Sequence, residues 1–412
     1  MSARRSLQLG MSAPPPNSGA SLPPYYPSCN GTRIPSYTAR PSIGEESLSR
    51  PIFARSLGRG EFTKTNGRIT LTLKDQPDDS LLPTYAHNDL VTGTISIQGC
   101  ESVTEIVLKL YGRLDLAASN GGHQTKLVND SYTVWNNDMR FQCPPSLPFS
   151  FLFPSTFKDE DLNIWPLPPS VRITPPGKSF VHVRCLYTLS VFVSTALHPR
   201  FSLWRGEKTL TIPVNLQSSA HPPRPIMPNT NLLATVKSAP DEWREILCKI
   251  GSKLHVKNIH CSFFIPSALV YSVADTIPFH LQITGSPAIL AGLVSSRGHP
   301  TISVRVHLLR RVSLFVRGQT QHRNIDMGEG VLSALPPPIT YPEEARSPEA
   351  AIDWAGVVRC DDSFAVGTFD AGTICVEDYI VVSIPGWDTE HKHPIQLVSH
   401  TWVDDPGPAY RM

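Results

Sequence analysis

A strict two-residue alternation in the middle of the chain most limits what this protein can fold into. In the stretch FVHVRCLYTLSVFVST, apolar side chains occupy every odd position from Val181 to Val193. The even positions carry mainly polar side chains, namely His182, Arg184, Thr188, Ser190 and Ser194. A period of two is typical of a β-strand with one buried face and one wet face. The stretch therefore predicts a long strand that is buried on one side only.

Shorter segments with the same alternation predict further strands on both sides of this one. They are 68–75, 89–99 and 104–116 before this strand, and 210–217, 258–266, 271–285, 301–318, 375–386 and 393–402 after it. Proline accounts for 40 of 412 residues, about twice the usual share, and proline breaks helix interiors. We therefore expect an all-β fold, with two tandem antiparallel β-sandwiches.

Shifts in composition suggest how the chain is divided. Residues 1–62 are rich in Ser, Pro, Gly and Arg and lack apolar periodicity, so we expect a disordered tail. We then expect a sandwich over 63–217, a linker with a short helix over 218–251, a second sandwich over 252–403 and a short end over 404–412. The helix is predicted for Ala239–Gly251, where Asp241 can cap it. Glu329–Ala350 is expected to form a long surface loop.

The two halves of the ordered region resemble each other. LVTGTISIQG in the first half matches SVADTIPFHLQITG in the second, through the shared pattern Val-x-(Gly/Asp)-Thr-Ile. EIVLKLYGR and TISVRVHLLRR follow in the same order. Duplication of one sandwich accounts for this order better than chance likeness between β-proteins.

Charge, cysteine usage and motifs limit the possible function. The net charge of +2 gives no general attraction to nucleic acid. We see no secretory signal and no apolar run that could span a membrane. The eight cysteines are scattered without a CxxC motif, which favours reduced thiols in a cytosolic protein. No spacing typical of a metal site, a nucleophilic catalytic site or a phosphate-binding glycine loop is present. We therefore expect no enzyme activity, no cofactor and no metal.

At these segments the chain resembles arrestin-domain proteins of the α-arrestin type found in fungi, the arrestin-related trafficking adaptors. The likeness is carried by DLVTGTISI, VTEIVLKLYGR, LPFSFLFP, LPPSV and HVRCLYTLSVFV in the first half, and by FFIPSALVYSVADTIPFHLQITGS and HPIQLVSHTW in the second. It covers roughly residues 67–403. The order of these segments across two domains carries the resemblance, rather than any single motif.

The resemblance implies a fold and a role. The fold is a pair of immunoglobulin-like sandwiches, an arrestin N-like and an arrestin C-like domain. Members are non-enzymatic adaptors in the cytoplasm, recruited to the plasma membrane or to endosomes through the cytoplasmic tails and loops of transporters or receptors. Many bind WW domains of HECT-type ubiquitin ligases through PPxY motifs, and so direct their cargo to ubiquitination and endocytosis. A monomer without nucleic-acid binding is expected.

A PPxY motif is present at Pro23-Pro24-Tyr25-Tyr26. Consecutive prolines favour the polyproline II conformation, which docks on aromatic-lined WW grooves with little loss of entropy. Pro23, Pro24 and Tyr26 are the predicted contacts, and a proline-rich spacer is the competing interpretation. Ile34-Pro35-Ser36-Tyr37 is a weaker look-alike, with Pro35 and Tyr37 as secondary candidates. Leu82-Pro83-Thr84-Tyr85 is interpreted as structural, because a strand follows it closely.

Basic side chains of the first sandwich are candidates for contacts with phosphate or acidic tails, since Arg and Lys form charge-assisted hydrogen bonds to phosphate. The candidates are Lys74, Lys109, Arg113, Arg172 and Lys178, with Arg184 and Arg205 beside them. The competing interpretation is that these residues only form the solvated faces of strands. Two other functions stay open: an arrestin-fold sorting scaffold without ligase recruitment, resembling the arrestin-like subunit of retromer, and an unrelated two-sandwich protein that handles carbohydrate.

Overall fold

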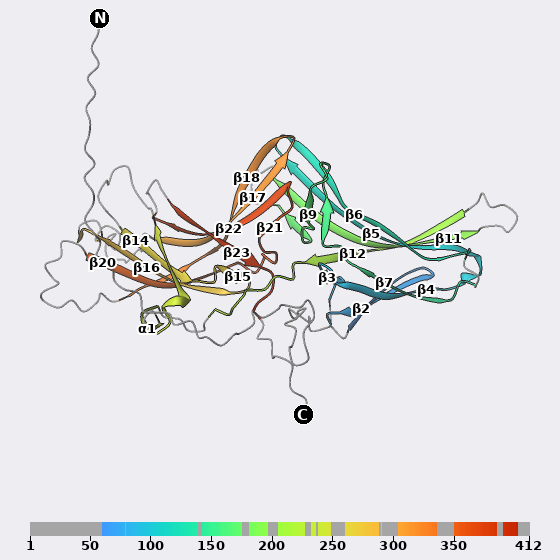
Figure 1. The fold of residues 1–412 in the computed structure, drawn as a ribbon, viewed down its shortest axis with the longest axis horizontal. Helices are drawn as coiled ribbons and strands as arrows, with labels where there is room; N and C mark the ends of the chain where they lie inside the picture. The colour runs from blue at the N-terminus through green and yellow to red at the C-terminus, as the bar shows by residue number, and fades with distance from the viewer. Residues whose placement is uncertain are drawn as a thin grey trace, which may run out of the picture. The chain divides into compact units, whose positions relative to one another are not determined.

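The predicted all-β fold is confirmed. The computed structural model describes residues 60–78, 80–138, 142–174, 181–196, 205–226, 232–235, 238–248, 260–287, 290, 304–335, 350–384 and 390–402. Within these ranges there are twenty-three strands, one four-residue helix and two 3-10 turns. The strands form two pairs of mainly antiparallel sheets, one pair in each half of the chain (Figure 1).

The first sandwich contains two sheets. One sheet has the order β1-β2-β4-β7, with β1 (Gly60–Asn66), β2 (Ile69–Gln76), β4 (Leu90–Ile97) and β7 (Ser146–Leu152). The other has the order β3-β12-β11-β5-β6, with β3 (Thr84–Ala86), β12 (Arg205–Gln217), β11 (His182–Ala196), β5 (Val103–Ala118) and β6 (Gly121–Asn136). The short strand β10 (Val171–Ile173) also pairs with β11. A small hairpin of β8 (Thr156–Lys158) and β9 (Ile164–Pro166) and the turn η1 (Cys100–Ser102) complete this half.

The second sandwich is built in the same way. One sheet has the order β13-β14-β16-β20-β19, with β13 (Trp243–Cys248), β14 (His260–Pro266), β16 (Thr276–Gly285), β20 (Ala350–Arg359) and β19 (Val331–Ala334). The other has the order β15-β23-β22-β17-β18, with β15 (Val270–Ser272), β23 (His391–Val398), β22 (Ile374–Ser383), β17 (Arg305–Val316) and β18 (Gln319–Glu329). The short strand β21 (Phe369–Asp370) also pairs with β22. The helix α1 (Leu232–Thr235) and the turn η2 (Pro240–Glu242) precede β13.

The topology confirms the internal repeat. Strand orders β3-β12-β11-β5-β6 and β15-β23-β22-β17-β18 are equivalent, each with one parallel pair, and β10 and β21 occupy equivalent edges. A side-chain turn repeats as well: Asp89 accepts a hydrogen bond from the amide of Ala86 at 2.6 Å, and Asp275 accepts one from the amide of Ser272 at 2.7 Å. The equivalence therefore pairs Asp275 with Asp89. The sequence pattern instead paired Asp275 with Gly93. It therefore matched the correct strands of the two halves, but its alignment of those strands was wrong by four residues.

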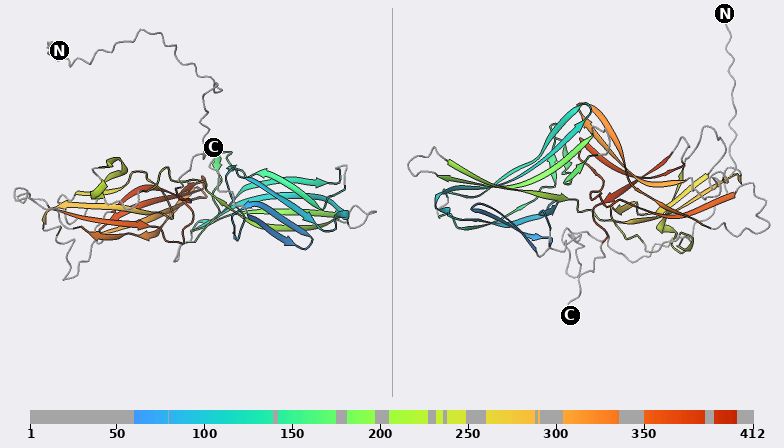
Figure 2. Two further views of the ribbon diagram at one scale, coloured as in Figure 1. Left: turned by 90° about the horizontal axis from the view of Figure 1, so that it is seen from below. Right: turned by 180° about the vertical axis from the view of Figure 1, so that it is seen from behind.

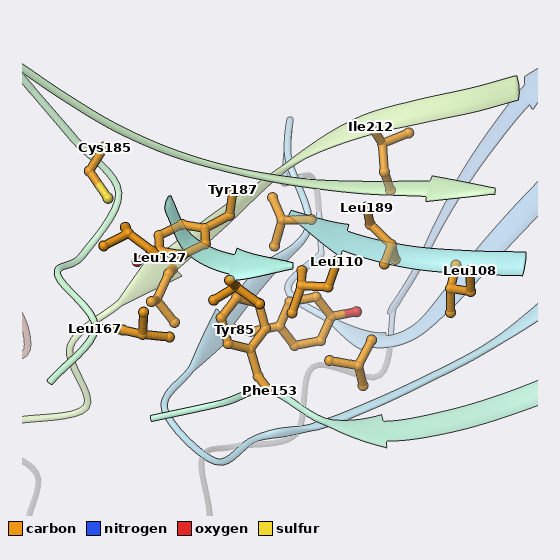
Figure 3. Close-up of a cluster of buried hydrophobic side chains, with 14 of the residues drawn as sticks. Tyr85, Leu108, Leu110, Leu127, Phe153, Leu167, Cys185, Tyr187, Leu189 and Ile212 are labelled. Atoms are coloured by element: carbon orange, nitrogen blue, oxygen red, sulfur yellow. The ribbon is translucent and has the colours of Figure 1, made fainter. Parts of the chain in front are cut away.

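The inward faces of the strands fill the core as the alternation predicts. Val183, Cys185, Tyr187, Leu189 and Val191 of β11 are at most 1% exposed. Figure 3 shows part of this cluster, where Tyr187 packs beside Phe153 with ring centroids 5.7 Å apart. The Tyr187 hydroxyl donates to the carbonyl oxygen of Pro168 at 2.7 Å, so its polar atom is satisfied inside the core.

One face of β17 packs into two hydrophobic clusters. Val306 and Leu308 lie in the cluster of the second sandwich, whereas Val312 and Leu314 lie in the cluster that contains the core of the first. These residues all face the same side of the sheet, because each lies opposite an inward residue of β22. The two sandwiches are therefore joined by a continuous strand and by shared apolar packing.

The predicted helix over Ala239–Gly251 is wrong for the described residues. Pro240–Glu242 form a single 3-10 turn, and Trp243–Cys248 form strand β13, which pairs with β14. Ile246 and Cys248 are buried in the second core, while the Trp243 indole donates to the Thr235 hydroxyl at 2.8 Å on the other face. As a strand, the segment packs Ile246 and Cys248 on one face and Trp243 on the other. This tertiary packing overrides the local helix signals.

Other boundaries also differ from those predicted. Strand β1 begins at Gly60, inside the range assigned to the tail, and β13 joins the second sandwich before residue 252. Val331–Ala334, within the expected loop, pair with β20. Strands β6, β18 and β20 had no clear alternation and were not predicted. The rest of the tail, Lys178 and most of the loop after β19 lie outside the described residues.

Candidate functional site: a basic sheet face beside a cavity

The outer face of the larger sheet in the first sandwich contains most of the predicted anion contacts. Arg172 of β10 lies directly opposite Arg184 of β11, and Arg184 lies opposite Asp115 of β5. Residues directly opposite each other in antiparallel strands point to the same side of the sheet. Because the neighbouring Val183 and Cys185 are fully buried, this side is the outer one. Arg172, Arg184 and Asp115 therefore form one row across three strands.

Three further cations extend this row along the sheet. Arg113 precedes Asp115 by two residues and so shares its side of β5, and Lys126 of β6 lies opposite Arg113. Lys109 lies on the same side of β5, four residues before Arg113. We call this set the basic face: Lys109, Arg113, Lys126, Arg172 and Arg184. Lys126 was not predicted. Opposite Gly112 and Arg113 of β5, the register with β6 shifts by one residue, and this bulge interrupts the alternation of β6.

The basic face is only partly neutralised. Arg113 Nε lies 3.3 Å from Asp115 Oδ2, and Gln124 donates to Asp115 Oδ1 at 2.7 Å. Within the described ranges, no ion pair involves Lys109, Lys126, Arg172 or Arg184. The nearest further carboxylates on this side, Glu105 and Glu207, lie near Ser194 at the far end of the sheet. The face therefore carries an excess of positive charge that is open to an anionic partner.

The other predicted candidates lie elsewhere. Lys74 is exposed on the outer side of β2, which belongs to the opposite sheet, so Lys74 cannot share a ligand with Arg184. Arg205 begins β12. The PPxY residues Pro23, Pro24 and Tyr26, the secondary pair Pro35 and Tyr37, and Lys178 fall outside the described residues. Tyr85 is 3% exposed in the first core, which confirms the structural interpretation of its Leu-Pro-Thr-Tyr motif.

A cavity of about 400 Å³ adjoins one end of the basic face. Its walls are Ser170–Thr174 around β10 on one side, and Arg310, Ile325 and the segment 363–366 on the other. All five residues from 170 to 174 line it, although successive side chains of a strand point to opposite faces of the sheet. The cavity therefore runs along the free edge of β10, which pairs with β11 alone among the described strands. Arg172 is the residue shared by the basic face and the cavity.

The polar groups of the cavity wall are mostly committed to internal hydrogen bonds. The Ser170 hydroxyl accepts from the amide of Leu216 at 2.9 Å, and the Thr174 hydroxyl lies 3.0 Å from His182 Nδ1. Arg310 is 3% exposed and donates to Asp378 through Nε at 2.7 Å and through Nη2 at 2.9 Å. The remaining cation at the cavity, Arg172, is the group best placed to meet a ligand.

Arg310 and Asp378 also occupy a distinctive place in the fold. They lie opposite each other on β17 and β22, between the residues that serve the second core and those that serve the first. The Thr368 hydroxyl donates to Asp378 Oδ2 at 2.8 Å and accepts from the amide of Leu397 at 3.0 Å. The pair also contacts the cavity wall. The ring centroid of Phe364, which belongs to that wall, lies 5.8 Å from the guanidinium carbon of Arg310.

The described residues include buried thiols and a histidine paired with a carboxylate. Burial raises the pKa of Cys185 to about 12 and that of Cys360 to about 12, which disfavours the reactive thiolate. His280 Nε2 lies 2.9 Å from Asp353 Oδ1, but no described hydroxyl or thiol is hydrogen-bonded to His280. Within the described ranges, no group of three potential ligands could hold a metal ion, and no helix has the length and apolar character that a membrane crossing requires.

Comparison with known proteins adds no family assignment. A scan against models of protein families finds no match, and a search of curated proteins finds none either. The function must therefore be argued from the site itself.

Proposed function

We propose that this protein is a non-enzymatic adaptor of the arrestin type that binds acidic or phosphorylated segments of membrane proteins on their cytoplasmic side. The observation that carries the proposal is the basic face, where Lys109, Lys126, Arg172 and Arg184 have no carboxylate partner among the described residues. A phosphate or a carboxylate cluster laid across β10, β11 and β5 would meet several of these cations at once. The cavity beside Arg172 would accept an apolar side chain of the same segment.

In this proposal the tail supplies the second interaction. Pro23, Pro24 and Tyr26 recruit a WW-domain ubiquitin ligase of the HECT type, so that the bound transporter or receptor is ubiquitinated and internalised. The protein would act in the cytoplasm, at the plasma membrane or at endosomes, wherever its cargo is. The duplicated sandwich supports a likeness to the two arrestin domains, and a sorting scaffold without ligase recruitment is the alternative.

The basic face is tested by charge reversal. We expect the double variant Arg172→Glu/Arg184→Glu to bind a fluorescent peptide with several phosphoserines at least about tenfold more weakly than wild type, since two favourable charge contacts become repulsive. Lys64→Glu/Lys74→Glu is the matched control, because it changes the net charge by the same amount on the opposite sheet. Fluorescence anisotropy at fixed ionic strength measures both. Equal weakening by the control would mean that net charge, and not this face, governs binding.

The tail motif is tested separately. We expect Tyr26→Ala to abolish capture of the full chain by isolated WW domains, because the Tyr side chain fills the groove beside the prolines. Tyr37→Ala is the matched control and should retain capture. Retention of capture by Tyr26→Ala would remove the ligase step. A second experiment deletes residues 1–59 and measures cargo binding. If cargo binding survives this deletion and Tyr26→Ala retains WW capture, the sorting scaffold is favoured.

A further inference from the structure

Two cysteines lie directly opposite each other on neighbouring strands of the second sandwich. Cys248 is the last residue of β13 and Cys261 is the second residue of β14, and the antiparallel register pairs them. Opposite residues in antiparallel strands have Cα atoms about 4.5–5.5 Å apart. A disulfide requires a Cα separation of about 4.4–6.8 Å. The register therefore sets the two residues at disulfide distance without backbone movement.

The surroundings direct both thiols toward each other. Cys248 is 7% exposed and Cys261 is 3% exposed, and both belong to the apolar core of the second sandwich. Their side chains point to the same side of the sheet, because paired residues do so. The hydrogen bond between the two side chains, together with burial, raises the pKa of Cys248 well above its usual value. The two sulfur atoms are thus neighbours in a dry environment.

The other described cysteines lack this arrangement. Cys185 lies beside the carbonyl oxygen of Pro168 at 3.7 Å, and Cys360 lies near the Arg310–Asp378 pair. Cys143 does approach Cys100, and burial raises its pKa to about 11, but neither residue lies in a strand, so no register fixes their relative geometry. Only the Cys248–Cys261 pair, among the described residues, is opposed across paired strands.

We propose that Cys248 and Cys261 form an oxidation site, which closes to a cross-strand disulfide when the protein meets hydrogen peroxide. Local opening of the edge strand β13 lets peroxide reach the pair, which burial otherwise shields. One thiol then loses its proton, and the thiolate attacks the peroxide, gives a sulfenic acid and releases hydroxide, which takes up that proton to become water. The second thiol then attacks that sulfur, forms the S–S bond and releases a second water. Two thiols lose two electrons and two protons in total, and the peroxide is reduced to two water molecules.

The disulfide would fasten an edge strand. β13 lies at the end of its sheet and has β14 as its neighbour there. The start of β13 is tied to the preceding segment, because the Trp243 indole donates to the Thr235 hydroxyl and Arg224 Nη1 donates to Glu242, just before the strand, at 3.4 Å. A covalent link at Cys248 would hold the other end of β13, where the described residues show no side-chain bond to that segment. Oxidation therefore stabilises the edge of the second sandwich.

The test uses the full chain in the folded state. The protein is treated with hydrogen peroxide, its remaining thiols are blocked, and it is digested with trypsin without reductant. Lys249 and Lys257 lie between the two cysteines, so trypsin separates them and a disulfide appears as two linked peptides in mass spectrometry. We expect this linked pair to be the dominant oxidation product, to disappear on reduction, and to raise the melting temperature by about 5 °C.

Matched variants keep the test decisive. Cys248→Ala and Cys261→Ala should each lose the linked peptides and the rise in melting temperature, whereas Cys360→Ala, another buried cysteine, should keep both. If either alanine variant folds poorly, the wild-type peptide map alone still decides. Peroxide treatment that leaves Cys248 and Cys261 unlinked, or that links them to other cysteines equally often, would overturn the proposal.

Discussion

Arg310 and Asp378 illustrate how one buried residue pair can separate two cores. The sheet formed by β17 and β22 is apolar on its inner side above and below the pair, and the pair is bidentate and almost fully buried. Taking two charges out of water is costly, and only good geometry and additional hydrogen bonds offset that cost. Here the Thr368 hydroxyl satisfies the remaining acceptor capacity of Asp378.

The pair predicts strong asymmetry between single and double substitutions. Arg310→Met leaves Asp378 buried without a counter-charge and should lower the free energy of unfolding by about 3–5 kcal/mol. The double variant Arg310→Met/Asp378→Leu should recover most of this loss, because apolar groups then replace both charges. Urea unfolding of Arg310→Met, of Asp378→Leu and of the double variant measures the coupling. Additive losses would show that the two side chains do not act as a pair.

His307 links stability to pH on the outer side of the same strand. Its side chain is 5% exposed and its Nε2 lies 3.8 Å from Asp326 Oδ1. Burial, and then the charge of Arg305, lower the pKa of His307 below its usual value, although Asp326, Glu329 and Glu390 oppose this shift. The folded protein therefore resists protonation that the unfolded chain accepts near pH 6.5, so folding stability should fall as the pH drops from about 6.5 toward the lowered pKa.

The variant His307→Gln should remove part of this acid sensitivity. We expect its unfolding free energy to fall less than that of wild type between about pH 7.5 and pH 5.5, because the group that takes up a proton only on unfolding is gone. Denaturant unfolding at the two pH values measures the difference. His393 has a pKa lowered by burial and by Arg244, so the variant should retain a smaller pH dependence. An unchanged slope in His307→Gln would contradict the assignment.

At the level of elements, alternation identified strands that have one continuous buried face, and it failed where the buried positions are unevenly spaced, as in β6 and β13. β11 was predicted in full because its inward residues are apolar and its outward residues are polar. β13 was mistaken for a helix because Trp243 packs on one face while Ile246 and Cys248 pack on the other, which breaks the period of two. Local sequence carries no sign that Thr235 will meet the Trp243 indole.

The candidate site shows a similar limit. Lys109, Arg113 and Arg184 were identifiable as polar positions of predicted strands, but their grouping with Arg172 and Lys126 was not. Arg172 meets Arg184 only because β10 folds back on β11, and Lys74 is excluded only because β2 joins the other sheet. Three-residue strands such as β10 are too short to show a period. Which strands share a sheet is decided by tertiary pairing.

At the scale of the whole described region, the two sandwiches should unfold together. Leu314 and Val312 of the second half are 0% exposed within the cluster that forms the first core. Further links are hydrogen bonds between two hairpin turns: Asn120 Nδ2 donates to the carbonyl oxygen of Val316 at 2.9 Å, and Arg317 Nη1 donates to the carbonyl oxygen of Asn120 at 3.1 Å. The β5–β6 and β17–β18 hairpins accordingly lie side by side (Figures 1 and 2). Shared packing of this kind couples the two cores.

This coupling predicts one calorimetric transition for the wild-type protein. Leu314→Ala should lower the free energy of unfolding by about 2–5 kcal/mol and split the transition into two, since it opens a cavity in the shared packing. Leu281→Ala is the matched control, because Leu281 is equally buried but lies in the second core only. It should lower the melting temperature without splitting the transition. Two transitions in the wild type would show that the sandwiches are energetically independent.

The contact between the two turns also bears on how a duplicated fold can diverge. The turns connect equivalent strands of the two repeats, yet one contributes the amide of Asn120 and the other the guanidinium of Arg317. In a symmetric pair of identical chains, the same surface appears on both partners, so each turn would have to carry both groups. A single chain with two repeats is free of that demand. Its two copies can specialise as donor and receptor, and a half-molecule expressed alone would lack the complementary turn.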